Sequence, residues 1–208
     1  MQKNTVLLDL QYLPPLQWFS KITKYESVLI EASEHYIKGS YRNRCHIAGA
    51  QGLLRLSVPL KGGKNAQTPI REVGISNAMP WQYQHWESIQ SAYGKSPFFE
   101  YYADDLKPFF HKEYNNLWDW NYDLVQCLIE ILDLDVTFTL TESYKKQTEE
   151  EIIDFRGGIH PNPTKSMDDP DFEVKPYGQV FTEKYDFIGN LSILDALFCK
   201  GPETVLLF

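Results

Sequence analysis

Residues 5–15 have the sequence TVLLDLQYLPP, an unbroken apolar run that ends in a polar loop containing two prolines. A second run of this kind, SVLIEA, occupies residues 27–32. Apolar runs without alternation are typical of strands in a parallel sheet that is covered on both faces. Between the two runs, Leu16, Phe19 and Ile22 recur at helical spacing, so residues 16–25 are predicted to form a helix. The pattern predicts a right-handed strand–helix–strand crossover.

The middle of the chain changes to hairpin chemistry and then to helical patterns. Residues 44–48 and 53–59 flank the loop Gly49–Gly52 and predict a β-hairpin, and residues 70–75 predict a further strand. Helices are expected at 81–93, 97–110 and 117–132, and a last strand at 135–140. The predicted fold class is α/β, with a mainly parallel Rossmann-like sheet and a β-hairpin in the N-terminal half and a helix-rich second half.

The length of 208 residues suits one domain with an extension. We expect residues 1–148 to form an α/β core domain and residues 149–176, which are charged and proline-rich, to form an irregular acidic loop. Residues 177–208 are then a C-terminal segment that packs back on the core. Within this segment a helix is expected at 191–198, with Asn190 as its cap.

Composition excludes several functional classes. A net charge of −8 argues against nonspecific binding to nucleic acid and against docking on an anionic membrane. No apolar run approaches the ~20 residues that span a bilayer, and the N-terminus lacks the apolar core of a signal peptide, so a cytoplasmic protein is expected. The 13 Tyr, 12 Phe and 5 Trp are expected mostly in the core, with some lining a groove.

Motifs for metals and common cofactors are missing from the sequence. Its 3 cysteines are widely spaced and form no CxxC pair, and its 5 histidines form no HExxH, so no metal site is predicted. Neither a P-loop nor a GxGxxG fingerprint follows the first strand. The sequence therefore points to no particular cofactor.

The strongest candidate for a binding site is the segment Tyr41-Arg42-Asn43-Arg44, which follows the second predicted strand. Ligands of open α/β sheets bind outside the carboxyl ends of the strands. In an extended segment Arg42 and Arg44 point the same way and make a fork for a phosphate or carboxylate. The alternative is an arginine pair bound to carboxylates such as Glu31 or Glu34.

Pro15 offers a second possible anion contact. Placed in the first turn of a helix, it leaves free N–H groups that face a ligand, with Gln11 and Tyr12 at the pocket rim. The alternative is an ordinary helix that starts with a proline.

Several motifs together resemble the WbqC-like protein family. They are Gln11–Pro15 with Trp18 and Phe19, YIKGSYRNRCHI at 36–47, LSVPL at 56–60, AYGKSPFF at 92–99, YGQVF at 177–181 and NLSILD at 190–195. The resemblance covers nearly the whole chain. The family usually has a proline directly after the glutamine, whereas Tyr12 follows Gln11 here.

The resemblance implies a cytoplasmic bacterial protein connected with O-antigen and surface-polysaccharide biosynthesis. It implies a transferase or ligase that modifies a nucleotide-linked sugar, and it carries no catalytic residues over to this chain. The site is therefore assigned from the residues themselves. The predicted substrate-binding residues are those of the two loops, Gln11, Tyr12, Tyr41, Arg42, Asn43 and Arg44.

Glu31 and Lys95 are the predicted acid–base residues. The predicted partner is a phosphate-bearing small molecule, with no nucleic acid and no membrane, and a homodimer is compatible with the sequence. The alternative is a noncatalytic binding or scaffold protein of a polysaccharide locus, whose exposed aromatics at 81–102 form a partner surface. Convergence of the predicted site residues on one pocket favours the enzyme, and scattered positions favour the scaffold.

Overall fold

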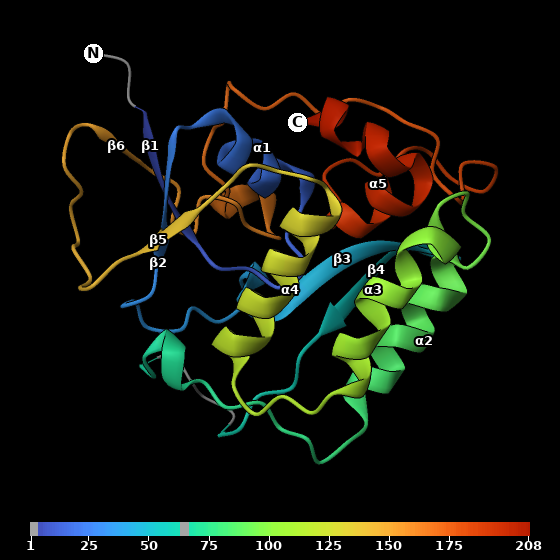
Figure 1. The fold of residues 1–208 in the computed structure, drawn as a ribbon, viewed down its shortest axis with the longest axis horizontal. Coiled ribbons are helices and arrows are strands. Elements are labelled where there is room, and N and C mark those ends of the chain that lie inside the picture. The colour runs from blue at the N-terminus through green and yellow to red at the C-terminus, as the bar shows by residue number, and fades with distance from the viewer. Residues whose placement is uncertain (1–3, 63–66) are drawn as a thin grey trace.

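The computed structural model describes residues 4–62 and 67–208. Its centre is a four-stranded parallel sheet with the strand order β5-β2-β1-β6. The strands are β1 (Thr5–Asp9), β2 (Ser27–Glu31), β5 (Phe138–Leu140) and β6 (Ile152–Asp154) (Figure 1). The predicted α/β class and parallel sheet are confirmed.

Helix α1 (Leu16–Lys24) makes the crossover between β1 and β2. Side chains alternate along each strand, so Val6 and Leu8 share the face that is buried in the core together with Trp18 of α1. The ring of Trp18 lies 5.9 Å from the ring of Phe138 on β5, edge to face, which places α1 against this side of the sheet. The register pairs Asp9 with Glu31, so two carboxylates end neighbouring strands at the same edge.

The β-hairpin is formed by β3 (Arg44–Gly49) and β4 (Gly52–Ser57), as predicted. Gly52 has φ +104°, a conformation that glycine adopts without strain. The prediction of a strand at 70–75 is wrong. This segment makes a short 3-10 turn (Ile70–Glu72) and isolated bridges, because its backbone bonds are divided between separate partners.

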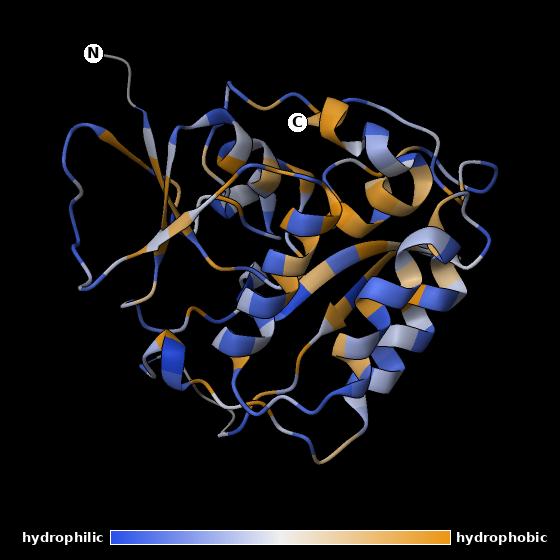
Figure 2. Ribbon diagram, in the orientation of Figure 1, coloured by the Kyte–Doolittle hydropathy of each residue, from blue (hydrophilic) through white to orange (hydrophobic). Residues whose placement is uncertain are grey.

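Three longer helices pack beside the hairpin: α2 (Trp81–Tyr93), α3 (Phe99–His111) and α4 (Leu117–Ile131). The prediction that most aromatics are core is confirmed for every tryptophan, since each is 4% exposed or less. Figure 2 shows apolar residues gathered where α5 (Ile193–Lys200) and the hairpin meet. None of the helices in residues 4–62 and 67–208 is long and apolar enough to cross a membrane.

The segment 149–176 contains two short regular elements. Strand β6 pairs with β1 on the side opposite β2, and Pro163–Lys165 forms a 3-10 turn. The ammonium of Lys21 on α1 lies 2.5 Å from the carboxylate of Asp169, with both side chains buried. The segment is thus attached to the sheet at one point and to α1 at another, and the division into core, loop and C-terminal segment stays a prediction.

The C-terminal segment is held by a buried carboxylate, Asp195 of α5. It accepts hydrogen bonds from the hydroxyl of Tyr93 at 2.8 Å, the hydroxyl of Tyr177 at 2.6 Å and the amide of Gln179 at 2.7 Å. Burial raises the pKa of Asp195, and the three donors act against that shift. These bonds join α5 to α2 and to the chain that precedes α5.

The cap of α5 differs from the prediction. Ser192, not Asn190, is the N-cap, and its hydroxyl accepts from the N–H of Leu194. Asn190 has φ +53°, and its side-chain oxygen accepts from the N–H of Gln17 at 3.0 Å. Asn190 therefore caps α1, which is distant from it in sequence.

Candidate functional site

A buried cluster of charges occupies the carboxyl edge of the sheet. Asp9 ends β1 and Glu31 ends β2, and both are 1% exposed or less. Arg42 enters the cluster from the loop that follows β2 and donates to Glu34 in two bonds, Nε to Oε1 at 2.7 Å and Nη2 to Oε2 at 2.6 Å. Its Nη1 lies 3.3 Å from Oδ2 of Asp9. One guanidinium thus joins the end of β1 to the loop that follows β2.

A second arginine, Arg156, follows β6 and completes the cluster. Its Nη1 donates to Glu31 at 2.7 Å and its Nη2 donates to Asp154 at 2.6 Å. The next residue, Gly157, donates its N–H to Oδ1 of Asp9 at 2.7 Å. The segment after β6 therefore supplies donors to both carboxylates that end the central strands.

Carboxylates outnumber arginines in this cluster, and burial changes their acidity. Burial raises the pKa of Glu34 to about 7, against the effect of Arg42 and with a further contribution from Asp9 and Glu31. Burial alone lowers the pKa of Arg42, but the carboxylates of Asp9 and Glu34 outweigh it and raise the pKa overall. Arg42 stays charged, and Glu34 is the group of the pair that titrates near neutral pH.

Gln11 and Tyr12 are fully buried and do not form a pocket rim, so that part of the prediction is wrong. The amide of Gln11 donates to Oδ2 of Asp9 at 3.1 Å, which brings Gln11 next to Arg42. The hydroxyl of Tyr12 lies 2.9 Å from Nδ1 of His85 on α2. Gln11 thus belongs to the charged cluster and Tyr12 to the core.

The expected extended conformation of Tyr41–Arg44 is also wrong. Residues 41–43 form a 3-10 turn whose N-cap is Ser40, so Arg42 and Arg44 do not point the same way. Asn43 accepts from the hydroxyl of Tyr36 at 2.8 Å and donates to the carbonyl of Val58 at 3.0 Å, which fixes the turn to the hairpin. The alternative reading holds for Arg42, which pairs with Glu34 in the interior.

The predicted acid–base residues are not brought together by any contact in the described part of the chain. Glu31 accepts from the hydroxyl of Thr141 at 2.5 Å as well as from Arg156. Lys95 is exposed in the turn between α2 and α3, and neither a hydrogen bond nor an ion pair links it to the cluster in residues 4–62 and 67–208. Glu31 is the member of the two that belongs to the carboxyl edge.

The start of α1 is not free to bind an anion. The N–H of Leu16 donates to the carbonyl of Leu191 at 3.2 Å, and the N–H of Gln17 donates to Asn190. Of the two alternatives that the sequence left open, the ordinary helix holds, because the C-terminal segment occupies those donors.

The outward face of the hairpin is basic. Cross-strand partners share a face, and His46 on β3 is directly opposite Arg55 on β4, while Arg44 precedes His46 by two residues. The opposite face carries Cys45, which is buried in the core. Neither Arg44 nor Arg55 has a carboxylate partner among the residues that the structure describes. Burial lowers the pKa of His46, and the two arginines lower it further.

A cleft of about 410 Å³ opens beside this face. His46, Leu53 and Tyr41 line one side, and His160 lines another. Nδ1 of His160 accepts from the N–H of Asn162 at 3.0 Å, and burial lowers the pKa of His160. Two imidazoles whose pKa values are lowered by burial thus face one cleft.

The sequence analysis named Arg44 and Tyr41 as binding residues but missed His46, Arg55 and His160, for a definable reason. Arg44 and His46 are two residues apart on β3, so their side chains lie on the same face of the hairpin, and the hairpin loop places Arg55 opposite His46. The sequence could therefore have predicted that these three side chains share one face. His160 comes from far along the chain and has no local signal. Within the described residues, no group of three or more His, Cys, Asp or Glu side chains is arranged to hold a metal ion.

Comparison with known proteins adds one relative and one family. The chain is 26% identical over 144 residues to the uncharacterized protein Rv1507c of Mycobacterium tuberculosis (strain ATCC 25618 / H37Rv). The aligned part covers 69% of this chain and 62% of the relative, so the chain spans under two thirds of that protein's length. No solved structure matches.

The sequence model of the WbqC-like protein family matches residues 11–159. This range contains Gln11, Glu31, Arg42 and Arg156 of the charged cluster and both arginines of the hairpin face. The matched range is more than half of the chain, and the protein therefore belongs to the WbqC-like protein family.

Proposed function

We propose that the protein is an enzyme that binds a phosphate-bearing activated small molecule, such as a nucleotide-linked sugar, in the cleft beside the hairpin. The observation that carries this proposal is that Arg44 and Arg55 have no carboxylate partner among the described residues and share the hairpin face of His46, which lines that cleft. The chain has 28 acidic against 20 basic residues, so a solvent-facing arginine has many possible carboxylate partners. Two adjacent arginines without one are available to an anionic ligand.

His46 is the proposed acid–base residue, a role that the sequence assigned to Glu31 and Lys95. It lies between the two arginines on the hairpin face, and its lowered pKa keeps it able to accept a proton at neutral pH. Arg42 and Glu31 then hold the edge of the sheet in place and do not contact the ligand. The reaction that we propose is that of a transferase or ligase in surface-polysaccharide biosynthesis, which is what the resemblance to the WbqC-like family implies.

The test is ligand stabilisation measured by differential scanning fluorimetry and calorimetry. The probes are uridine diphosphate N-acetylglucosamine, uridine diphosphate and uncharged N-acetylglucosamine. A ligand at a hundred times its Kd stabilises the folded protein by about 2.7 kcal/mol. We expect both phosphate-bearing probes to raise the melting temperature, and the free sugar to leave it unchanged.

Arg44→Gln and Arg55→Gln should reduce this stabilisation. Arg71→Gln is the matched control, since Arg71 is an exposed arginine that stacks on Trp118, 5.6 Å from the ring centre, outside the cleft. Equal stabilisation of all three variants would reject the arginine pair as the anion site.

A noncatalytic partner-binding role is the second candidate, because Tyr83 on α2 and Tyr101 on α3 are 53% and 75% exposed. Exposed aromatic side chains on two neighbouring helices suit a protein partner. Stabilisation by none of the phosphate-bearing probes, together with partner binding lost on Tyr101→Ser, would favour this role over the enzyme.

A further inference from the structure

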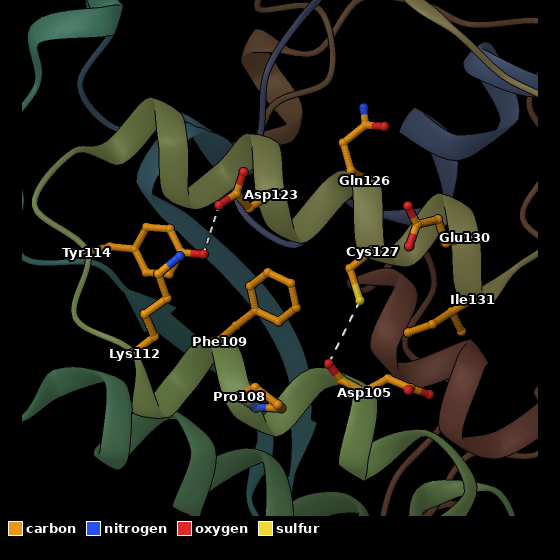
Figure 3. Close-up of a pocket in the computed structure, with 10 residues that line it drawn as sticks. All are labelled: Asp105, Pro108, Phe109, Lys112, Tyr114, Asp123, Gln126, Cys127, Glu130 and Ile131. Atoms are coloured by element: carbon orange, nitrogen blue, oxygen red, sulfur yellow. Dashed lines mark hydrogen bonds between the residues drawn. The ribbon is translucent and has the colours of Figure 1, made fainter.

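A cleft of about 820 Å³ lies between α3 and α4, and its lining residues differ from those of the hairpin cleft. Figure 3 shows Phe109 and Cys127 directed into the space between the two helices. The thiol of Cys127 lies 3.9 Å from the carbonyl oxygen of Asp105 across the cleft. Its walls are thus close enough for one small ligand to contact both helices.

The charge of this cleft is negative and unbalanced. Asp105 of α3 and Asp123 and Glu130 of α4 line it, whereas Lys112 is the one lysine among its lining residues. None of these four side chains forms an ion pair within the described residues. Burial raises the pKa of the Cys127 thiol to about 11, and Asp105 and Glu130 add to the rise, so both carboxylates act on the same point of the cleft.

The cleft also contains a contact between a cation and an aromatic ring. The ammonium of Lys112 lies 4.8 Å from the ring centre of Tyr114, and the hydroxyl of Tyr114 donates to Asp123 at 2.9 Å. The negative face of an aromatic ring attracts a cation, and a nearby carboxylate strengthens the attraction. The chain's own lysine therefore occupies a position that favours an ammonium group, while no cation contacts the ring of Phe109 among the residues that the structure describes.

We propose that the cleft between α3 and α4 binds an organic cation that carries an ammonium or guanidinium group on a flat apolar body. The apolar body packs on Phe109 and Ile131, and the cationic group lies between Asp105 and Glu130. Lys112 repels the ligand and limits its affinity. This site is independent of the proposed anion site, because the two share no lining residue.

The test uses isothermal titration calorimetry on the full chain, with benzylammonium as the probe and benzyl alcohol as its uncharged match. We expect benzylammonium to bind about two- to fivefold or more tightly than benzyl alcohol. Equal affinities, or no heat from either compound, would overturn the proposal.

Variants locate the site. Asp105→Asn and Glu130→Gln should each weaken benzylammonium binding about two- to fivefold, while Asp104→Asn, an exposed neighbour on α3 that does not line the cleft, should have no effect. Lys112→Met should strengthen binding by a similar factor, because it removes the competing charge and keeps an apolar stem. A loss of affinity in Lys112→Met, or unchanged affinity in both carboxylate variants, would contradict the proposal.

Cys127 supplies a second readout that does not depend on heat. Its alkylation by iodoacetamide, identified by comparison with Cys127→Ser, should slow when benzylammonium is bound and should not slow with benzyl alcohol. Equal alkylation rates with and without saturating benzylammonium would place any bound cation elsewhere and overturn the assignment to this cleft.

Discussion

Arg42 and Glu34 meet in a two-bond ion pair with distances of 2.7 and 2.6 Å, and their side chains are 0% and 4% exposed. The same guanidinium contacts Asp9 at the end of β1. An arginine in this position is bound on two sides by the protein itself. Its first role is to close the carboxyl edge of the sheet, whereas Arg44 two residues later keeps its charge available.

Arg42→Ala should destabilise the protein strongly. Removing one partner of a buried ion pair leaves uncompensated charge in the interior and costs about 3–5 kcal/mol. Urea denaturation measures this loss as a change in the free energy of unfolding. An Arg42→Ala protein as stable as the wild type would show that the pair contributes nothing to the fold.

Arg44→Ala should affect ligand affinity more than the free energy of unfolding, the opposite of Arg42→Ala. Its half-buried side chain has no ion pair in residues 4–62 and 67–208, so the loss of stability should stay below about 1 kcal/mol. Loss of a charge-assisted hydrogen bond costs about 1.5–3 kcal/mol, which corresponds to a roughly tenfold or greater rise in Kd for uridine diphosphate. Calorimetry and denaturation on the same variant separate the two effects, and a large loss of stability with unchanged Kd would make Arg44 a structural residue.

Glu34 should make stability depend on pH. Its pKa rises from 4.5 to about 7 on folding, so the folded state binds the extra proton. The stabilisation from this group is therefore complete below pH 4.5 and is lost as the pH rises to about 7, by up to about 3 kcal/mol. The difference between the pH–stability curves of wild type and Glu34→Gln measures it, and a difference that stays constant between pH 4.5 and 7 would contradict the shift.

His85 should make the protein more stable as the pH rises, the opposite of the effect of Glu34. Burial lowers its pKa from 6.5 to about 4, while a backbone hydrogen bond with Ser57 opposes the shift. The unfolded state then binds the extra proton, so the stabilisation is present above pH 6.5 and is lost as the pH falls to about 4. Between pH 4.5 and 6.5 the contributions of Glu34 and His85 to the wild-type stability oppose each other. His85→Gln should uncover the decline with rising pH that Glu34 causes, and a variant curve parallel to that of the wild type would argue against this compensation.

The ion pair between Lys21 and Asp169 should contribute far more to stability than its neighbour. Lys21 and Asp169 are 0% and 5% exposed, whereas Lys24 and Asp171 are 43% and 48% exposed. Asp169→Asn should cost about 3–5 kcal/mol and expose residues 156–176 to limited proteolysis. Asp171→Asn should cost under about 1 kcal/mol, and equal protease sensitivity of the two variants would reject the buried pair as the attachment of this segment.

Local patterns were sufficient to predict most of the fold. The parallel start, the hairpin and α2 to α4 follow from short-range periodicity, and the structure confirms them. Strand β6 was not predicted because it has only 3 residues in a charged, proline-rich stretch. Its extended conformation is stabilised by pairing with β1. The prediction of a strand at 70–75 was wrong because this segment has no neighbouring strand to pair with along its length, although its apolar residues fit a strand pattern.

The candidate site was less predictable because it depends on single side chains. The rule that loops meet at the carboxyl edge brought Gln11, Glu31 and Arg42 into one region. The hydroxyl of Ser40 accepts from the N–H of Arg42 at 3.4 Å and starts a 3-10 turn that directs Arg42 into the interior. The rule about strand ends could not predict this turn. His160 reaches the cleft through tertiary structure alone.

The pairing of β6 with β1 also has a consequence for the order in which the protein can fold during synthesis. Thr5 cannot pair with Ile152, its partner in the register, until residue 152 has been synthesised. Asp9 likewise cannot accept from Gly157, which is 148 positions later in the chain, until that residue has been added. Contacts so distant in sequence slow folding, because the chain pays the entropy of loop closure before it gains them. A nascent chain that has released only its first 148 residues has an unpaired edge on β1 and lacks the N–H of Gly157 that donates to Asp9, although Gln11 and Arg42 are already present. The carboxyl edge therefore cannot reach its final shape before residues 152–160 have left the ribosome.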